Sequence, residues 1–422
     1  MIRRAVPAIL LTAVLAACAA PSLRSVIPGS SAVATGYGSA ANLPTKGQPL
    51  SGKVVRITGS NNVEMTKLVA QGFDVYGKDG NAIIGEMSDE MFAQLTKSGR
   101  RIEEVPFRAM TPRNTFDKGY HTYEALANEL KGLAGSHPDI ATLHDIGDGW
   151  EKTAGKANRD IWAIQISSKK NTGPKPSLLF MGCTHGRELA STEVPFLVAK
   201  NLIENYGKDP KITEWVDTRD IWFVPMVNPD GHARAEQGYS WRKNANSTNG
   251  GANSTAFGVD LNRNYSYMWG GGGTSPSPTD QTYKGPSALS EPETQAIDRL
   301  MASHKFTFSV SYHSFSNEVM WPWSYSTSPA PDAKLMSTIG TKMAKMANYT
   351  FEQSAGMYIA AGDSDDMAYS KYKVLPFTVE IGTYQDGFDP PYSKVQQFYK
   401  ENKLGAEYLM TIADNPQAAL TR

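Results

Sequence analysis

Residues 177–188 read Ser-Leu-Leu-Phe-Met-Gly-Cys-Thr-His-Gly-Arg-Glu. Residues 177–181 are apolar on both faces, which is typical of a strand buried within a sheet that helices cover. His185 and Glu188 follow that strand directly, and α/β sheets bind ligands at the carboxyl ends of their strands. An imidazole and a carboxylate three residues apart can bind one Zn²⁺, which accepts both kinds of donor. The pair alone is weak evidence, because a His and a Glu on the surface give the same pattern.

Similar apolar runs recur along the chain on both sides of this strand. They cover residues 161–166, 221–227, 306–311 and 375–379, and helical patterns lie between several of them, notably over residues 192–206 and 291–304. Strands that alternate with helices predict a mixed central sheet flanked by helices. The fold class is therefore α/β, and we expect the main domain over residues 118–415.

Two further polar residues also close buried strands. His313 ends the run 306–312, whereas the other histidines fall in helices, connectors or a turn: His121, His137, His144, His232 and His304. Glu380 closes the run 375–379. A catalytic zinc usually has three protein ligands, and a zinc hydrolase also needs a base that takes a proton from water. Taken singly, His313 is more often a satisfied buried histidine, and Glu380 fits a helix cap or an arginine partner as well.

Two polar segments offer groups that bind a carboxylate. Asn262 and Arg263 are adjacent and can bind one carboxylate through two hydrogen bonds. Arg242, between Trp241 and Lys243, supplies another cation. Each of these side chains also fits a solvated surface position.

Six motifs together resemble the carboxypeptidase A/B family of zinc metallocarboxypeptidases. The resemblance covers roughly residues 118–413, and both the order and the spacing of the motifs fit the family. The motifs are His185-Gly-Arg187-Glu188, Asn228-Pro-Asp-Gly231, Trp241-Arg242-Lys243, Gly258-Val-Asp-Leu-Asn262-Arg263-Asn264, His313-Ser314 and Phe377-Thr-Val-Glu380.

The resemblance implies an enzyme that hydrolyses the C-terminal peptide bond of peptides or proteins. It implies that His185, Glu188 and His313 hold one Zn²⁺ and that Glu380 is the general base. Arg242 is implied to polarise the scissile carbonyl and to stabilise the oxyanion that develops there.

The resemblance also implies a set of substrate-binding residues. Asn262, Arg263 and Tyr358 are expected to hold the terminal carboxylate, and Arg187 is expected to contact the substrate farther from the chemistry. Asp365 stands where the basic-specific members of the family carry an acid, which implies a preference for C-terminal Lys or Arg. Asp363 adds a second acid nearby that shifts or broadens this preference. The alternative is that these aspartates only make turns and caps.

The N-terminus has the pattern of an export signal. Arg3 and Arg4 precede an apolar run over residues 5–15, which is too short for an ordinary membrane span. Residues 15–18, Leu-Ala-Ala-Cys, resemble the bacterial lipobox, in which the cysteine is lipidated. We therefore expect a signal peptide over residues 1–17 and an exported lipoprotein anchored to the membrane through Cys18, in the periplasm or at the cell surface. The alternative is a secreted protein from which Cys18 has been removed.

Two segments separate this signal from the main domain. Residues 18–49 are rich in Ser, Ala, Gly and Pro, which is typical of a flexible tether. Residues 50–108 show a β-α-β-β-α-β pattern that predicts a small α/β sandwich. The family resemblance implies that this unit is a prosegment, with Arg100-Arg101 and Arg113 as nearby sites for cleavage. A permanent accessory domain is the alternative.

Composition excludes one class of function and leaves others open. The chain has 42 basic and 42 acidic residues, whereas nucleic-acid binders carry a basic excess. Cys183 is the only cysteine besides Cys18, so we expect no intrachain disulfide in the mature protein, which we expect to be a monomer. Two competing functions remain: a zinc hydrolase of cell-wall peptides or side-chain amides, and a surface-binding lipoprotein without activity.

Overall fold

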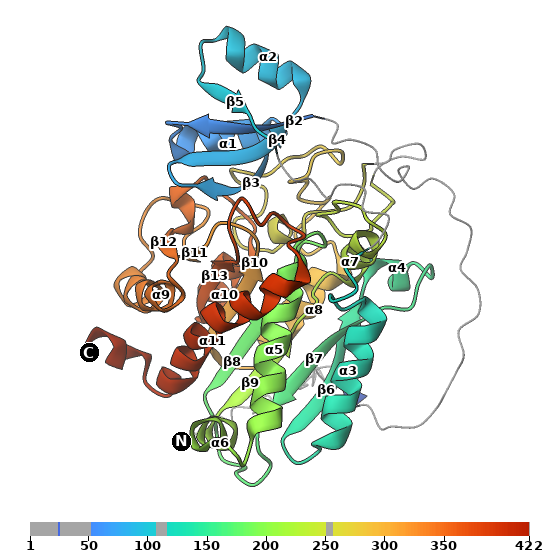
Figure 1. Ribbon diagram of the computed structural model, residues 1–422, viewed down its shortest axis with the longest axis vertical. Helices are drawn as coiled ribbons and strands as arrows, with labels where there is room; N and C mark the ends of the chain where they lie inside the picture. Colours follow the sequence, from blue (N-terminus) through green and yellow to red (C-terminus); the bar gives the residue numbers. More distant parts are fainter. Residues whose placement is uncertain (1–23, 26–51, 107–115, 250–255, 422) are drawn as a thin grey trace, which may run out of the picture.

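A computed structural model describes residues 24–25, 52–106, 116–249 and 256–421 (Figure 1). The expected signal peptide lies outside these residues, as does Cys18 with most of the expected tether. Within the tether, Arg24–Ser25 form a two-residue strand, β1, that pairs with the edge of the main sheet. No helix in the described part of the chain is both long and apolar enough to cross a membrane.

The main body is built on a nine-stranded mixed sheet with the order β1-β6-β7-β9-β8-β10-β13-β11-β12. The other strands are β6 (Ala141–Asp148), β7 (Asp160–Ile166), β8 (Ser177–Met181), β9 (Asp220–Val224), β10 (Phe306–His313), β11 (Glu318–Trp321), β12 (Thr350–Gln353) and β13 (Leu375–Glu380). The four central strands β9, β8, β10 and β13 run parallel to one another. Every residue of β8 is buried, as its two apolar faces require.

Helices cover both faces of this sheet (Figure 1). One face carries α3 (Tyr123–Ser136), α5 (Leu189–Asn205), α6 (Pro210–Thr218), α9 (Ala333–Ala347) and α11 (Val395–Ile412), which share one apolar cluster with the strands. The opposite face carries α8 (Pro292–Ser303) and α10 (Ser364–Tyr372), which form a second cluster. Neither cluster contains a residue of 52–106, so the main body has a hydrophobic core of its own. This arrangement confirms the predicted α/β class.

The shorter elements of the body lie in its connections. They are the helices α4 (Trp150–Thr153) and α7 (Pro229–Glu236) and the 3₁₀ turns η1 (Leu261–Arg263), η2 (Ser354–Gly356), η3 (Tyr392–Lys394) and η4 (Pro416–Leu420). The turn η1 carries two of the residues expected to bind the substrate carboxylate.

Residues 52–106 form a separate small unit at one end of the molecule (Figure 1). Its elements are β2 (Lys53–Thr58), α1 (Asn62–Ala70), β3 (Asp74–Asp79), β4 (Ala82–Met87), α2 (Asp89–Lys97) and β5 (Ile102–Glu104). The four strands make an antiparallel sheet in the order β3-β4-β2-β5, with Val55, Ile57 and Phe73 in its core. The β-α-β-β-α-β pattern expected from the sequence is therefore present. Strand β3, at the edge of this sheet, faces the main body (Figure 1).

Candidate active site

Three neighbouring parallel strands deliver the candidate catalytic residues to one edge of the sheet. Strand β10 pairs with β8 on one side and with β13 on the other. His313 and Glu380 are the last residues of their strands and lie directly opposite each other in the register. The loop after β8 brings His185 and Glu188 to the same edge. Because the carboxyl ends of parallel strands meet at one edge, residues far apart in the sequence converge here.

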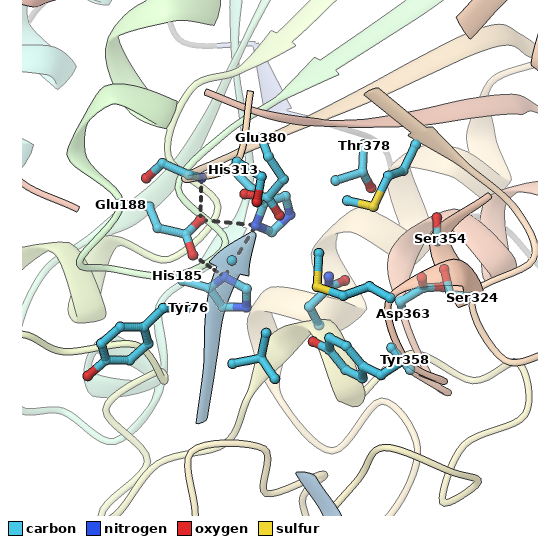
Figure 2. A pocket seen from close by; sticks show the side chains of 18 of the residues that line it. Tyr76, His185, Glu188, His313, Ser324, Ser354, Tyr358, Asp363, Thr378 and Glu380 are labelled. Atoms are coloured by element: carbon cyan, nitrogen blue, oxygen red, sulfur yellow. Dashed lines mark hydrogen bonds and ion pairs between the residues drawn. The ribbon is translucent and has the colours of Figure 1, made fainter. Parts of the chain in front are cut away.

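His185, Glu188 and His313 form a compact set of ligand atoms (Figure 2). The Nδ1 atom of His185 lies 2.7 Å from one carboxylate oxygen of Glu188, and Nδ1 of His313 lies 3.0 Å from the other. The two Nδ1 atoms are 3.2 Å apart. All three side chains are buried, and their donor atoms lie within 4.8 Å of one another. Two imidazoles and one carboxylate are a ligand set of catalytic zinc sites, so the residues fit this ion.

Asp260 supports these ligands and was not assigned a role from the sequence. Its Oδ1 lies 3.2 Å from Nε2 of His185, and its Oδ2 accepts two hydrogen bonds from the Arg242 guanidinium, at 2.9 and 3.1 Å. On the other ligand, Nε2 of His313 lies 3.0 Å from Oγ of Ser311. Such partners orient a ligating histidine and fix which ring nitrogen faces the metal. Asp260 is completely buried, which by itself would raise its pKa. Arg242 and the other cationic groups around Asp260 outweigh this effect and hold its pKa well below the ordinary value.

Glu380 stands beside His313 in the same cavity (Figure 2). Burial raises the pKa of Glu380 to about 8. The Glu188 and Glu318 carboxylates also raise this pKa, whereas the cationic His313 and Arg242 lower it. A general base that exchanges protons near neutral pH needs a pKa in this range. A cation bound nearby would lower the pKa of Glu380 from about 8. Glu188 differs, because its two histidine neighbours lower its pKa despite its burial.

The residues expected to bind the terminal carboxylate lie together across the cavity. Asn262, Arg263 and Tyr358 all line it, and Nη2 of Arg263 donates a 2.8 Å hydrogen bond to the Tyr358 hydroxyl. Arg242 also lines the cavity, with Nη1 3.4 Å from Nδ1 of His185. The cavity encloses about 660 Å³, part of it open to solvent. It can therefore hold a peptide end between the candidate metal site and a cationic clamp.

The side-chain pocket differs from the sequence-based expectation. Asp363 lines the cavity (Figure 2), whereas Asp365 does not. The buried Asp365 lies behind Thr378, whose hydroxyl donates a 2.8 Å hydrogen bond to its carboxylate. The physical reason is the start of α10: Asp363 is its N-cap, and two helical steps of about 100° each turn Asp365 away from the N-cap side. Burial and the Asp363 charge raise the pKa of Asp365 to about 7.

Arg187 is engaged by the small unit. Its guanidinium makes two hydrogen bonds, at 2.9 and 3.2 Å, with the carboxylate of Asp74 at the start of β3. Both side chains are buried, which makes this a desolvated bidentate ion pair. The next residues of β3, Val75, Tyr76 and Gly77, line the same cavity as His185 and Glu380. The small unit therefore lies over the candidate active site.

One other group of potential metal ligands occurs in the described residues. Asp145, Asp148 and Asp160 bring carboxylate oxygens within 4.8 Å of one another on strands β6 and β7. Lys152 already pairs with Asp148 at 2.7 Å and also with Asp160. This half-buried acidic group thus has a cation from the chain itself, unlike the buried His-Glu-His set.

Comparison with known proteins places this geometry in a family. Residues 126–405 match the family model described as zinc carboxypeptidase. A zinc carboxypeptidase of Saccharothrix mutabilis subsp. capreolus is 27% identical over 396 residues, which cover 86% of this chain and 89% of the relative. Metallocarboxypeptidase A of Trichophyton equinum is 32% identical over 340 residues, 76% of this chain and 78% of the relative.

A solved structure supports the same fold. The carboxypeptidase A from Helicoverpa armigera matches with a TM-score of 0.73 and 23% identity, covering 88% of this chain and 99% of that chain. At this identity the match shows the fold alone. Together with the family match, the His-Glu-His set and the neighbouring Glu380 give the chain its identity. The chain belongs to the zinc carboxypeptidase family and is a metallocarboxypeptidase that uses one zinc ion to hydrolyse C-terminal peptide bonds.

Proposed function

We propose that His185, Glu188 and His313 hold the zinc ion and that Glu380 is the general base. The observation that carries this proposal is the convergence of three buried ligand atoms beside a carboxyl of raised pKa. When bound, Zn²⁺ supplies Lewis-acid polarisation and makes water more acidic. Glu380 takes the proton of the attacking water and later gives it to the leaving amine.

Arg242 stabilises the charge that develops on the scissile carbonyl oxygen. Two of its nitrogens, Nε and Nη2, are held by Asp260, which fixes the plane of the guanidinium. Its third nitrogen, Nη1, lies next to the candidate metal ligands and donates toward the reacting carbonyl. A donor that is already oriented stabilises an oxyanion without reorganising during the reaction.

Asn262, Arg263 and Tyr358 select substrates with a free terminal carboxylate. Arg263 is buried, and an internal peptide bond brings no negative charge to pair with it. This clamp favours an exopeptidase over a hydrolase of side-chain amides. The predicted signature is removal of one residue at a time from the C-terminus and no reaction on the matching peptide amide.

We propose a preference for C-terminal Lys or Arg, with Asp363 as the acid that meets the substrate side chain. Asp363 lines the cavity, and Asp365 lies behind Thr378 and reinforces the negative potential from there. Ser324, Ser354 and Thr378 also line the cavity, together with the apolar Met320 and Met357, so Asp363 has polar neighbours that can accept hydrogen bonds from an ammonium or guanidinium group. A basic side chain therefore suits this pocket better than Phe or Leu.

The function is tested on the full chain after trypsin has cut it between residues 107 and 115 and has then been inactivated. Matched peptides end in free Lys, free Phe or Lys amide, and mass spectrometry follows the released residue with and without a zinc chelator. We expect chelator-sensitive release from the free acids only, and faster release of Lys than of Phe. Zinc-loaded, folded protein that cleaves the amide equally well would favour the amidase function, and protein that cleaves none would favour the binding function.

We also propose that residues 52–106 are a prosegment that blocks the site until it is removed. The Asp74–Arg187 ion pair and the cavity-lining residues of β3 support this proposal. Of the expected cleavage sites, Arg113 lies outside the described residues, whereas Arg100 is tied to Ser60 and to Glu64. Arg101, the neighbouring expected site, is exposed, so we propose cleavage at Arg101 or Arg113 rather than at Arg100.

Replacing Asp74 by Asn tests the prosegment. The change leaves the buried Arg187 without its counter-charge, a loss of about 3–5 kcal/mol for a buried pair, so the unit docks less tightly. We expect the uncut Asp74→Asn chain to cleave a C-terminal Lys peptide at least about tenfold faster than the uncut wild type. Asp89→Asn, on the exposed first turn of α2, is the matched control. Equal rates before and after trypsin in the wild type would identify an accessory domain instead.

For the N-terminus we propose export and a lipid on Cys18, with the mature enzyme acting as a monomer. The Leu-Ala-Ala-Cys sequence of residues 15–18 supports the lipid. Cleavage behind the prosegment then releases the catalytic body from the membrane. Cys18→Ser should move the uncut protein from the membrane fraction to the soluble fraction, and light scattering after trypsin should give the mass of one body.

A further inference from the structure

Lys78 of the small unit forms ion pairs with two acidic residues of the main body. Its Nζ pairs with the Glu352 carboxylate and lies 3.5 Å from Oε1 of Glu318. Its backbone N–H donates a 3.1 Å hydrogen bond to Oγ of Ser316. Both the side chain and the backbone of Lys78 are therefore held by the body.

Glu318 and Glu352 are arranged as a site for a cation. Strands β11 and β12 run parallel, with Glu318 opposite Thr350 and Glu352 two residues farther along, so the two acids share one face of the sheet. Glu318 is 2% exposed, and its Oε2 is buried without a hydrogen-bond partner. A buried carboxylate is costly unless a cation or donors satisfy it. Within the described residues, Lys78 is the one cation paired with either acid.

The acids lie next to the catalytic machinery. Strand β11 pairs antiparallel with β13, and Glu318 stands directly opposite Glu380 in the register. Directly opposite residues of antiparallel strands have Cα atoms about 5 Å apart. An extended peptide advances about 3.3 Å per residue, so a side chain within about three residues of the scissile bond can reach Glu318.

Strand β3 runs along the active-site cavity. Its residues Val75, Tyr76 and Gly77 line the cavity that holds His185 and Glu380, and Lys78 follows immediately. A Cβ atom on Gly77 would lie 2.1 Å from the carbonyl oxygen of Phe315, so only glycine lets this backbone approach so closely. Strand β3 therefore lies against Phe315 and Ser316, beside the active-site cavity.

We propose that Glu318 and Glu352 form a subsite for a basic side chain of the peptide substrate, on the amino side of the scissile bond. Lys78 fills this subsite while the small unit is docked, and a substrate Lys or Arg fills it afterwards. This inference rests on the proposed carboxypeptidase activity and extends it to a second position of the substrate. The class of substrate is a peptide with a basic residue shortly before its last residue.

The test uses the full chain cut by trypsin, with the small unit removed by size exclusion and the trypsin inactivated. The body retains its own core, and circular dichroism and zinc content check each preparation. Matched peptides share one C-terminal residue and carry either Lys or Gln at one, two or three residues before the scissile bond. The readout is the ratio of kcat/KM for the Lys peptide to kcat/KM for the Gln peptide, in which any change at Glu380 cancels.

We expect a ratio of about ten at one of these positions in the wild type, the size of one charge-assisted contact. Glu318→Gln and Glu352→Gln should bring that ratio close to one. Glu352 is partly exposed, so it gives a second variant if Glu318→Gln folds poorly. Glu352→Lys should reverse the preference, and Glu124→Gln, exposed on α3, should leave the ratio at ten.

Three results would overturn the subsite. If the wild type cleaves all peptides with a ratio near one, the subsite alone is overturned. The same holds if Glu318→Gln, Glu352→Gln and Glu352→Lys all leave the wild-type ratio unchanged. Cleavage of no peptide by zinc-loaded protein overturns the proposed function together with the subsite.

Discussion

The two ends of the active-site cavity differ in how their residues are positioned. At the metal end, His313 and Glu380 close adjacent strands, and His185 and Glu188 follow the strand beside them. At the pocket end, Ser324, Ser354 and Asp363 come from the loop after β11, the turn η2 and the start of α10, and Thr378 stands on β13. A strand end or the loop directly after a strand positions each residue of the first group, whereas loops and a helix start position all of the second group except Thr378. A functional residue is therefore easiest to place from the sequence when it stands at the end of a strand or directly after one.

The largest effect is expected at Glu380. Glu380→Gln removes the proposed base but keeps its size, so kcat/KM for a C-terminal Lys peptide should fall by about 10²- to 10⁴-fold. Zinc content, measured by mass spectrometry of the metal, should stay at one ion per chain, because the three ligands remain. If the variant kept more than a tenth of the wild-type activity, Glu380 would not be the general base, and the proposed mechanism at the metal end would be wrong.

Asp260 gives the next largest effect. Asp260→Asn weakens the contacts that orient His185 and Arg242 together. Loss of such a supporting partner lowers metal affinity about 10- to 100-fold, which competition with a chelator measures. The matched control is Asp145→Asn in the other acidic group, which should leave zinc affinity unchanged. Unchanged affinity in Asp260→Asn would show that the strand ends alone position the metal ligands.

A pair of variants compares the two aspartates of the pocket end. Asp363 lines the cavity and Asp365 lies behind Thr378. Asp363→Asn should therefore lower the ratio of Lys to Phe release by about tenfold, and Asp365→Asn by less than about threefold. The reverse order would restore Asp365 as the pocket acid and would mean that the pocket rearranges around a bound substrate.

The smallest effect concerns a histidine outside the metal site. His121 contacts two carboxylates, Glu193 and Glu129, which raise its pKa to about 9 against the effect of burial. Because the folded-state pKa lies above the unfolded value of about 6.5, this stabilisation is complete below pH 6.5 and is lost as the pH rises through 9.

Urea denaturation of the wild type and of His121→Gln measures this loss. The difference in unfolding free energy should shrink by about 1 kcal/mol between pH 6.5 and pH 9.5, since partial exposure screens the charges. A difference that does not change with pH would show that His121 is neutral in the folded protein, as the metal-binding histidines must be.

The sequence predicted which residues come together at the candidate metal site and at the proposed carboxylate clamp, and it predicted the order of elements in the small unit. Apolar runs in the sequence predict where buried strands end. His313 and Glu380 stand at the ends of such runs, and His185 follows one. The segment Lys78-Asp79-Gly80-Asn81 is typical of a hairpin turn, and it joins β3 to β4 with Gly80 at a positive φ of 59°.

Other features depend on contacts between distant segments and left no local pattern. Asp74 and Arg187 are 113 residues apart and meet only because the small unit docks over the cavity. Asp260 was visible as part of a motif, but its bonds to His185 and Arg242 arise from the tertiary fold. The family resemblance singles out Asp365 as the pocket acid, whereas the start of α10 brings Asp363 to the cavity instead.

Anomalous diffraction at the zinc edge, from crystals of the full chain grown with zinc, tests the central claim most directly. One strong peak is predicted within bonding distance of Nδ1 of His185, the Glu188 carboxylate and Nδ1 of His313. A peak at Asp145, Asp148 and Asp160 instead, with none between the two histidines, would contradict the assignment of the metal site.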